Sequence, residues 1–318
     1  MEKRDSTIDI MKGIGIILVI LGHAIQNNYV PLNKVILSFH MPLFFFVSGM
    51  LFHPVKRGGY REYAVKKIKT LMFPQILLGV LLAIFEVVIL CLVLHRKNLD
   101  NISFLECFTQ WFLIVMLYVV LIFPLIQKYI DWKNRKVIAC YMIVVVSIAA
   151  MSASLQVNTL LSLEKTPMAL LFYSLGYLVN QNGYRDKINR TMNRCWIFLI
   201  PALILLAEIN APIGMYENHY GNLLLFALTS LIGIGLCMYC SEIIKYNDCL
   251  VLFGKYSIVV YCTHFVLVKF FRLVLNYILP DSVDTGVYPI YFVLFLIILC
   301  LENIIIHLWD RGVKTKRL

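Results

Sequence analysis

The stretch from Asp9 to His53 decides the fold; it reads DIMKGIGIILVILGHAIQNNYVPLNKVILSFHMPLFFFVSGMLFH. Its two apolar segments carry Asp9, Lys12, His23 and His40 at positions where lipid would otherwise be the neighbour. A charged side chain inside a bilayer is costly, so such a group usually faces the interior of the protein or a wet cavity. The stretch therefore predicts a functional site inside a membrane protein.

The composition of the whole chain agrees with a membrane location. The 318 residues are 60% hydrophobic and 15% charged, with a mean hydropathy of +0.80, so polar side chains are too few to cover a soluble globule. The net charge of +11 is spread between apolar runs without a basic, aromatic-rich patch, and no nucleic-acid partner is expected. Cys237 and Cys240 form a CxxC, but inside an apolar run, and no metal is expected. We expect residues 1–318 to form one all-α domain, a polytopic integral membrane helical bundle.

Ten apolar runs are long enough to be interpreted as membrane spans. They cover about residues 10–27, 35–53, 70–94, 109–127, 137–154, 168–181, 195–210, 221–243, 256–279 and 288–307. Most Lys and Arg residues fall in alternate loops, and the other loops carry only Lys34, Arg96, Lys97 and Lys165. Because cytoplasmic loops retain positive charge, both termini are expected in the cytoplasm.

Lys12 and His23 are predicted to share one face of the first helix. Eleven residues at about 100° each leave them roughly 20° apart in rotation and about 16 Å apart along the axis. Lys12 then lies near the cytoplasmic end, and His23 and His40 near the outer end. Simpler interpretations remain: Lys12 as a snorkelling lysine, each histidine as a hydrogen-bonding bridge between helices, and Asp9 as an N-cap, with Ser6 and Thr7 as rivals. Asp9 is otherwise expected to pair with Lys12, three residues on.

Several short motifs resemble the acyltransferase 3 family of membrane acyltransferases. They are Lys12-x10-His23 with the preceding Asp9, SFHMPLFFFVSGMLF at residues 38–52, KKIKTLMFP ending at Pro74, QWFL at 110–113, FYSLGYL at 172–178 and GKYSIVVYCTH at 254–264. The likeness is closest to the stand-alone fucose 4-O-acetylase-like branch. Lys12 stands where many members have Arg, which keeps the charge but loses bidentate geometry.

The resemblance implies transfer of an acyl group, commonly acetyl, from cytoplasmic acyl-CoA to a hydroxyl of a glycan or glycolipid at the outer face. It implies a multi-pass protein of the bacterial inner (cytoplasmic) membrane, surrounded by membrane lipids, with acetyl-CoA as co-substrate. The phosphates of the donor would favour the basic inner loops, with Lys66, Lys67 and Lys69 as candidates beside Lys12. His23 is the expected general base, with a covalent acyl-histidine route open. His40 and Ser48 are unranked candidates for a donor to the oxyanion.

Other buried or outer groups carry weaker expectations. Glu86 and Glu208 lie in outer halves of their spans and could pair with Arg272, either as structural pairs or facing the acceptor. His264 lies in the inner half of the ninth span, inside a family-like motif. Trp111 is interpreted as a packing or interfacial residue, and the polar outer loop at 210–222 as an ordinary solvated loop, with a cover for the acceptor as the alternative. An ion-coupled transporter is the rival function, because transporters also need ionisable groups inside the membrane.

Overall fold

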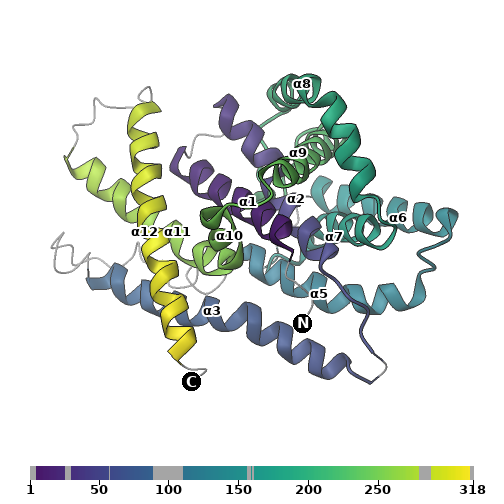
Figure 1. The fold of residues 1–318 in the computed structure, drawn as a ribbon, viewed down its shortest axis with the longest axis horizontal. Coiled ribbons are helices and arrows are strands. Elements are labelled where there is room, and N and C mark those ends of the chain that lie inside the picture. Colours follow the sequence, from purple (N-terminus) through teal and green to yellow (C-terminus); the bar gives the residue numbers. More distant parts are fainter. Residues whose placement is uncertain are drawn as a thin grey trace.

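The described part of the chain is built from helices (Figure 1). The computed structural model describes residues 5–25, 30–56, 58–88, 110–155, 159, 161–278 and 288–315. Within these ranges the α-helices are α1 (Ser6–Ile25), α2 (Pro31–Met50), α3 (Tyr60–Val88), α5 (Trp111–Tyr129), α6 (Arg135–Ser154), α7 (Thr166–Gln181), α8 (Arg185–Ile209), α9 (Leu223–Ile244), α10 (Asp248–Lys255), α11 (Ser257–Ile278) and α12 (Tyr288–Thr315). Two short 3-10 turns, η2 (Leu163–Lys165) and η3 (Met215–Glu217), precede α7 and α9. The predicted all-α class is confirmed.

The outer helices present apolar side chains where a soluble protein would present polar ones. Among the described residues, 8 helices are long and apolar enough to cross a membrane, and the number rises to 9 if the bent pair α10 and α11 is one span. Only 11% of the apolar window of α6 and of α8 is buried, and Ile143 and Phe198 are 66% and 75% exposed. Such surfaces suit lipid, which confirms a multi-pass membrane protein. The sixth of the ten expected spans corresponds to α7, whose 16 residues are fewer than the roughly 17 to 25 that a helix needs to cross a bilayer.

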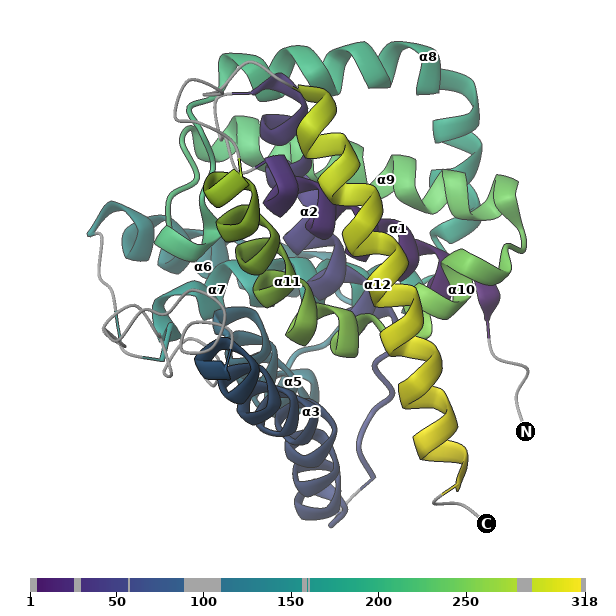
Figure 2. The ribbon, with the colours of Figure 1, turned by 90° about the vertical axis from the view of Figure 1, so that its left-hand side faces the viewer.

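Helices α1 and α2 form the centre of the bundle. Their apolar windows are 67% and 72% buried. Figures 1 and 2 show them surrounded by the other helices, with α3 and α5 on one side, α8 and α9 on another, and α11 and α12 across a third. The stretch that opens the sequence therefore lies in the middle of the molecule, where polar groups are kept from lipid.

Small residues let α2 and α7 approach closely. A Cβ atom added at Gly49 would overlap the carbonyl oxygen of Tyr173, and one added at Gly176 would overlap the carbonyl oxygen of Phe46. Glycines at such crossings replace side-chain packing with close backbone contact, a common way to join helices in membranes. Two of the family-like motifs, at 38–52 and 172–178, thus hold the centre of the bundle together.

The helices extend beyond the apolar runs that predict them. Helix α3 begins at Tyr60, so Lys66, Lys67 and Lys69 lie on a helix and the prediction of a basic loop there is wrong. Hydropathy marks only the part of a helix that faces lipid, and basic side chains can continue the same helix into the interface. The start of α1 also differs from the expectation, because Asp5 caps it: its Oδ1 accepts the Thr7 backbone N–H at 3.0 Å.

The short helix α10 was not predicted. It meets α11 at a bend of 86°. As a result α11 begins at Ser257 within the bundle, beside α1, rather than continuing a straight span from Asp248.

Candidate functional site

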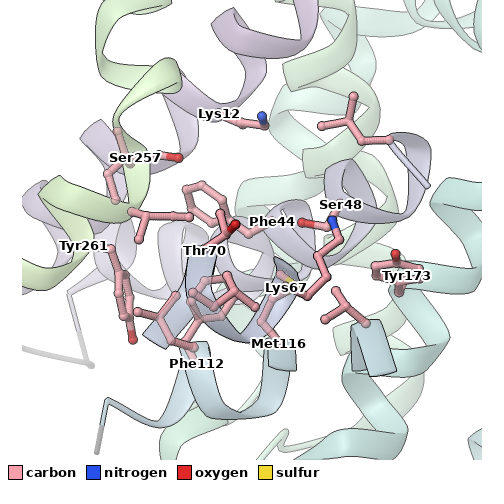
Figure 3. A pocket seen from close by; sticks show the side chains of 16 residues that line it. Lys12, Phe44, Ser48, Lys67, Thr70, Phe112, Met116, Tyr173, Ser257 and Tyr261 are labelled. Atoms are coloured by element: carbon pink, nitrogen blue, oxygen red, sulfur yellow. The ribbon is translucent and has the colours of Figure 1, made fainter. Parts of the chain in front are cut away.

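A cavity of about 210 Å³ opens among the central helices (Figure 3). We call it the inner cavity, because it contains Lys12 from the end of α1 that is expected near the cytoplasm. It is lined by residues of α1, α2, α3, α5, α7 and α11. The polar side chains on its wall are Lys12, Ser48, Lys67, Thr70, Ser257, Tyr173 and Tyr261. Two lysines from different helices, Lys12 and Lys67, give the cavity a cationic character.

The structure separates Lys67 from its two neighbours. Lys67 lines the inner cavity and is partly buried, with its Nζ 5.5 Å from the centre of the Tyr63 ring, whereas Lys66 and Lys69 are exposed and outside that lining. Helical geometry explains the division, since residues one or two positions apart point in different directions. Of the three predicted lysines, Lys67 alone lines this cavity, and a donor-binding role for each of them stays a prediction.

The inner cavity also receives the start of α11. Ser257 is the first residue of that helix and lies on the cavity wall. The first amide groups of a helix lack intrahelical partners and carry the positive end of the helix dipole. Lys12 lies 3.8 Å from Asp9, so the expected pair on α1 is present. The lysines and the first amide groups of α11 together suit a ligand that carries several negative charges.

A second cavity, of about 300 Å³, contains the two histidines of the opening stretch. Its wall consists of Val19, Gly22, His23, Asn33, Leu37, His40, Met41, Trp111, Ile213, Gly214, Met215, Tyr216, Glu217, Tyr261 and Phe265. Because His23 and His40 come from antiparallel neighbours α1 and α2, their shared location follows from the predicted topology. We call this the outer cavity.

Backbone contacts set the orientation of two imidazoles. Nδ1 of His40 lies 2.7 Å from the carbonyl oxygen of Ile36, and Nδ1 of His264 lies 3.0 Å from that of Val260. A carbonyl oxygen only accepts, so each neutral ring carries its proton on Nδ1 and keeps a lone pair on Nε2. Both rings are therefore built as proton acceptors at Nε2.

The His23 ring is held by two rings of α11. Its centroid lies 5.1 Å from that of His264 and 5.8 Å from that of Phe265. The sequence predicts His264 in the inner half of its span and His23 near the outer end of its own helix. The structure nevertheless brings the two rings together, because α11 begins beside α1 within the bundle. His264 is buried, and its Nε2 has no hydrogen-bond partner among the described residues.

Tyr261 lies between the two cavities, since it lines both. The order of lining residues along the helices agrees with this arrangement. On α1, Lys12 and Ile16 face the inner cavity, and Val19 and His23 face the outer one. The two cavities thus lie one after the other along α1, with cations in one and imidazoles in the other.

The two candidates for the oxyanion donor do not share a cavity. Ser48 lies with Lys12 in the inner cavity, whereas His40 lies with His23 in the outer one. They are eight residues apart on α2, or about 12 Å along its axis. Ser48 is thus placed with the cation site and away from the His23 imidazole.

Two of the remaining charged candidates, Glu208 and Arg272, have structural partners. Glu208 pairs with Lys34 at 3.2 Å, so the expected Glu208–Arg272 pair is not formed. Arg272 instead donates from Nη2 to the carbonyl oxygen of Ala24 at 2.7 Å, at the last turn of α1, where a cation is favourable. It thereby supports the turn that carries His23. The side chain of Glu86 lies outside the part of the chain that the structure describes.

Some site residues were missed by sequence reasoning. Thr70 lines the inner cavity three residues after Lys67, and Tyr261 lies three residues before His264. A spacing of three places both pairs on one helix face, so the signal was present once one member of each pair was singled out. Nothing in the local pattern indicated that Tyr261 would face both cavities. In the described ranges, no group of three His, Cys, Asp or Glu residues is placed to hold a metal ion.

Comparison with known proteins identifies the family of the chain. A family described as "Acyltransferase domain" matches residues 5–305. Nodulation protein NolL of Sinorhizobium fredii (strain NBRC 101917 / NGR234) is 48% identical over 59 residues, a segment that spans 16% of this chain and 16% of that protein. No solved structure matches. The family match favours acyl transfer over ion-coupled transport as the function of the chain. The chain belongs to this family of membrane acyltransferases.

Proposed function

We propose that the protein transfers an acetyl or other short acyl group from cytoplasmic acyl-CoA to a hydroxyl of a cell-surface glycan or lipid-linked sugar. The observation that carries this proposal is the pair of neighbouring cavities that share Tyr261 as a wall residue. One holds two lysines and suits a polyanionic donor, and the other holds imidazoles and suits activation of a hydroxyl. The matched relative is bacterial, which supports the expected location in a bacterial inner membrane.

The donor would bind with its phosphates at the inner cavity. Coenzyme A is a polyanion with a long flexible arm, and Lys12, Lys67 and the start of α11 offer positive charge on that side. Ser48 and Thr70 add hydroxyl groups beside these cations. The arm would then lead the thioester past Tyr261 toward His23.

The transfer step needs a base near the acceptor hydroxyl. In our proposal a ring nitrogen of His23 takes the hydroxyl proton while the hydroxyl oxygen forms a bond to the thioester carbonyl carbon. The resulting tetrahedral intermediate expels the CoA sulfur, which receives the proton from His23. A positioned base typically contributes about 10²- to 10⁴-fold to such a step.

The neighbouring histidines would support this step in different ways. His40 in its neutral form has no proton on Nε2, because its proton is on Nδ1, which donates a hydrogen bond to the Ile36 carbonyl oxygen. It can therefore stabilise an oxyanion only as an imidazolium. His264 would act as a positioning residue, since its ring contacts that of His23. Transfer through an acyl-histidine at His23 uses the same path and remains the alternative order of events.

A purified preparation tests the proposal. Full-length protein in lipid nanodiscs would be incubated with acetyl-CoA, and release of the free CoA thiol would be followed with and without a glycan acceptor. His23→Ala should reduce turnover by about 10²-fold or more, while acetyl-CoA binding, measured by calorimetry, persists. Turnover by His23→Ala equal to that of the wild type would refute the role of His23. No turnover and no donor binding by the wild type would refute the function itself.

A further inference from the structure

One wall of the outer cavity consists of residues that have no role in the transfer step proposed above. Residues 213–217, in the connection between α8 and α9, form one side of it together with Trp111 at the start of α5. This wall brings two aromatic side chains, Trp111 and Tyr216, and one carboxylate, Glu217, to the cavity that contains His23.

The connection is a built structure rather than a loose loop. Gly214 and His219 exchange two backbone hydrogen bonds, of 2.9 and 3.0 Å. The Asn210 side chain closes the ends of the connection, donating to the Tyr220 carbonyl at 3.2 Å and accepting from the Asn222 amide at 2.7 Å. The backbone of the wall is thus held in place before any ligand binds, which lowers the entropy lost on binding.

A buried ion pair anchors the same connection. Glu164 and Lys165 of η2 form a salt bridge with both side chains almost fully buried. Lys165 Nζ lies 5.8 Å from the centre of the Tyr216 ring. Burial alone would raise the pKa of Glu164, but hydrogen bonds from Lys165 and Thr159 hold that pKa below its ordinary value. An ionised pair therefore persists beneath Tyr216.

A hydrogen-bonded link joins this anchor to the turn after Glu217. Ser152 Oγ donates to the Glu164 carbonyl oxygen at 2.8 Å, and Asn218 Nδ2 donates to the Ser152 carbonyl oxygen at 3.1 Å. Asn218 adopts a left-handed conformation, with φ of 56°, which an asparagine tolerates better than most residues. These contacts fix the backbone of the turn that follows Glu217.

The carboxylate of Glu217 is available to a ligand. It forms no hydrogen bond or ion pair with any described residue, and its Oε2 lies over Gly214, where an added Cβ would be only 3.0 Å away. A carboxylate accepts hydrogen bonds from hydroxyl groups, and an aromatic ring offers an apolar face. This combination matches a sugar ring, which has hydroxyl groups at its edge and C–H groups on its faces.

We propose that residues 213–217 and Trp111 form the acceptor subsite, and that it takes one pyranose ring, with Trp111 against a ring face and Glu217 accepting from a hydroxyl. The inference rests on the proposed acyl transfer and names the chemical class of its acceptor. The cavity volume of about 300 Å³ is at the lower end for ligand sites, which suits one ring. The hydroxyl nearest His23 would receive the acyl group.

Methyl pyranosides serve as probes for this subsite. Full-length protein in nanodiscs, with saturating radiolabelled acetyl-CoA, would be offered the methyl glycosides of glucose, galactose and mannose, and cyclohexanol as a ring alcohol with a single hydroxyl. For an accepted pyranoside, Glu217→Gln should raise KM by about fivefold to tenfold, because a neutral amide oxygen is a weaker acceptor than a carboxylate.

Control variants separate this inference from the function on which it rests. Asp186→Asn removes the same charge at the exposed start of α8 and should leave the acceptor KM unchanged. The inference is overturned if Glu217→Gln also leaves that KM unchanged. It is equally overturned if cyclohexanol is acetylated as well as the pyranosides, or if a wild type that hydrolyses acetyl-CoA acetylates no pyranoside. A wild type that consumes no acetyl-CoA would instead overturn the acyl transfer, and the subsite with it.

Discussion

Three lysines within four positions of α3 should differ sharply in their contribution to donor binding. Lys67 faces the inner cavity, whereas Lys66 and Lys69 are exposed outside it. Loss of a hydrogen bond from a charged group to a phosphate is worth about 1.5 to 3 kcal/mol, and about 1.4 kcal/mol changes an equilibrium constant tenfold. We therefore expect Lys67→Ala to raise the KM for acetyl-CoA by about tenfold to a hundredfold.

The exposed lysines provide matched controls on the same helix. Exposed charges typically contribute about 0 to 1 kcal/mol, so Lys66→Ala and Lys69→Ala should raise that KM by less than about fivefold. Because Lys67 contacts the donor far from the reacting carbon, kcat should be nearly unchanged in Lys67→Ala. Lys67→Met, which keeps the length of the side chain without its charge, separates charge from packing.

The assay is the initial rate of CoA thiol release against acetyl-CoA concentration, at low and high salt. Screening by salt should reduce the small effects of Lys66 and Lys69 more than the effect of the partly buried Lys67. Equal effects of the three alanine substitutions would refute the reasoning, because they would show that diffuse surface charge, rather than a lysine in the cavity, holds the donor phosphates.

Three further predictions concern the architecture around the site. Lys165→Met should lower the apparent unfolding temperature, because an unpaired buried charge costs about 3 to 5 kcal/mol, and adding Glu164→Gln should restore most of the loss. Gly176→Ala should destabilise the junction of α2 and α7 by about 1 to 3 kcal/mol through overpacking, seen as a lower unfolding temperature in detergent. Tyr261→Trp should narrow the junction between the cavities and lower kcat by about a hundredfold, while donor binding measured by calorimetry is retained.

Each of these predictions has a clear contrary outcome. If the double substitution at Glu164 and Lys165 is no more stable than Lys165→Met alone, the ion pair is not the source of the cost. A Gly176→Ala protein as stable as the wild type would contradict the close approach of the two backbones. If Tyr261→Trp turns over at the wild-type rate, the acyl group does not pass between the cavities at that residue.

The hydropathy of the sequence located the helices more accurately than the residues at which they begin and end. Hydropathy located the lipid-facing part of α3 near residue 70 but not its start at Tyr60, because the first turns carry Lys66, Lys67 and Lys69. It also missed α10, whose eight residues are too short to register as a span. The bend between α10 and α11 depends on tertiary packing, which no local pattern reports.

Within the site, the sequence predicted what lies along one helix and missed what helices bring together. The Asp9–Lys12 pair, and the separation of Lys12 from His23, follow from helical geometry alone. The contact between the His23 and His264 rings does not, because it depends on where α11 begins in the bundle. The wall at residues 213–217 was interpreted as a solvated loop, since its folding depends on partners as distant as Ser152.

The central claim is that an acyl group crosses from the Lys12 side of the bundle to the His23 side, and a sidedness assay tests it most directly. Inverted membrane vesicles, with their cytoplasmic face outward, would receive radiolabelled acetyl-CoA from outside, with His23→Ala vesicles as the blank. The account predicts base-labile label on glycans that an added impermeant esterase cannot remove until detergent opens the vesicles. Label that the esterase removes from intact vesicles, or label formed equally by His23→Ala, would contradict it.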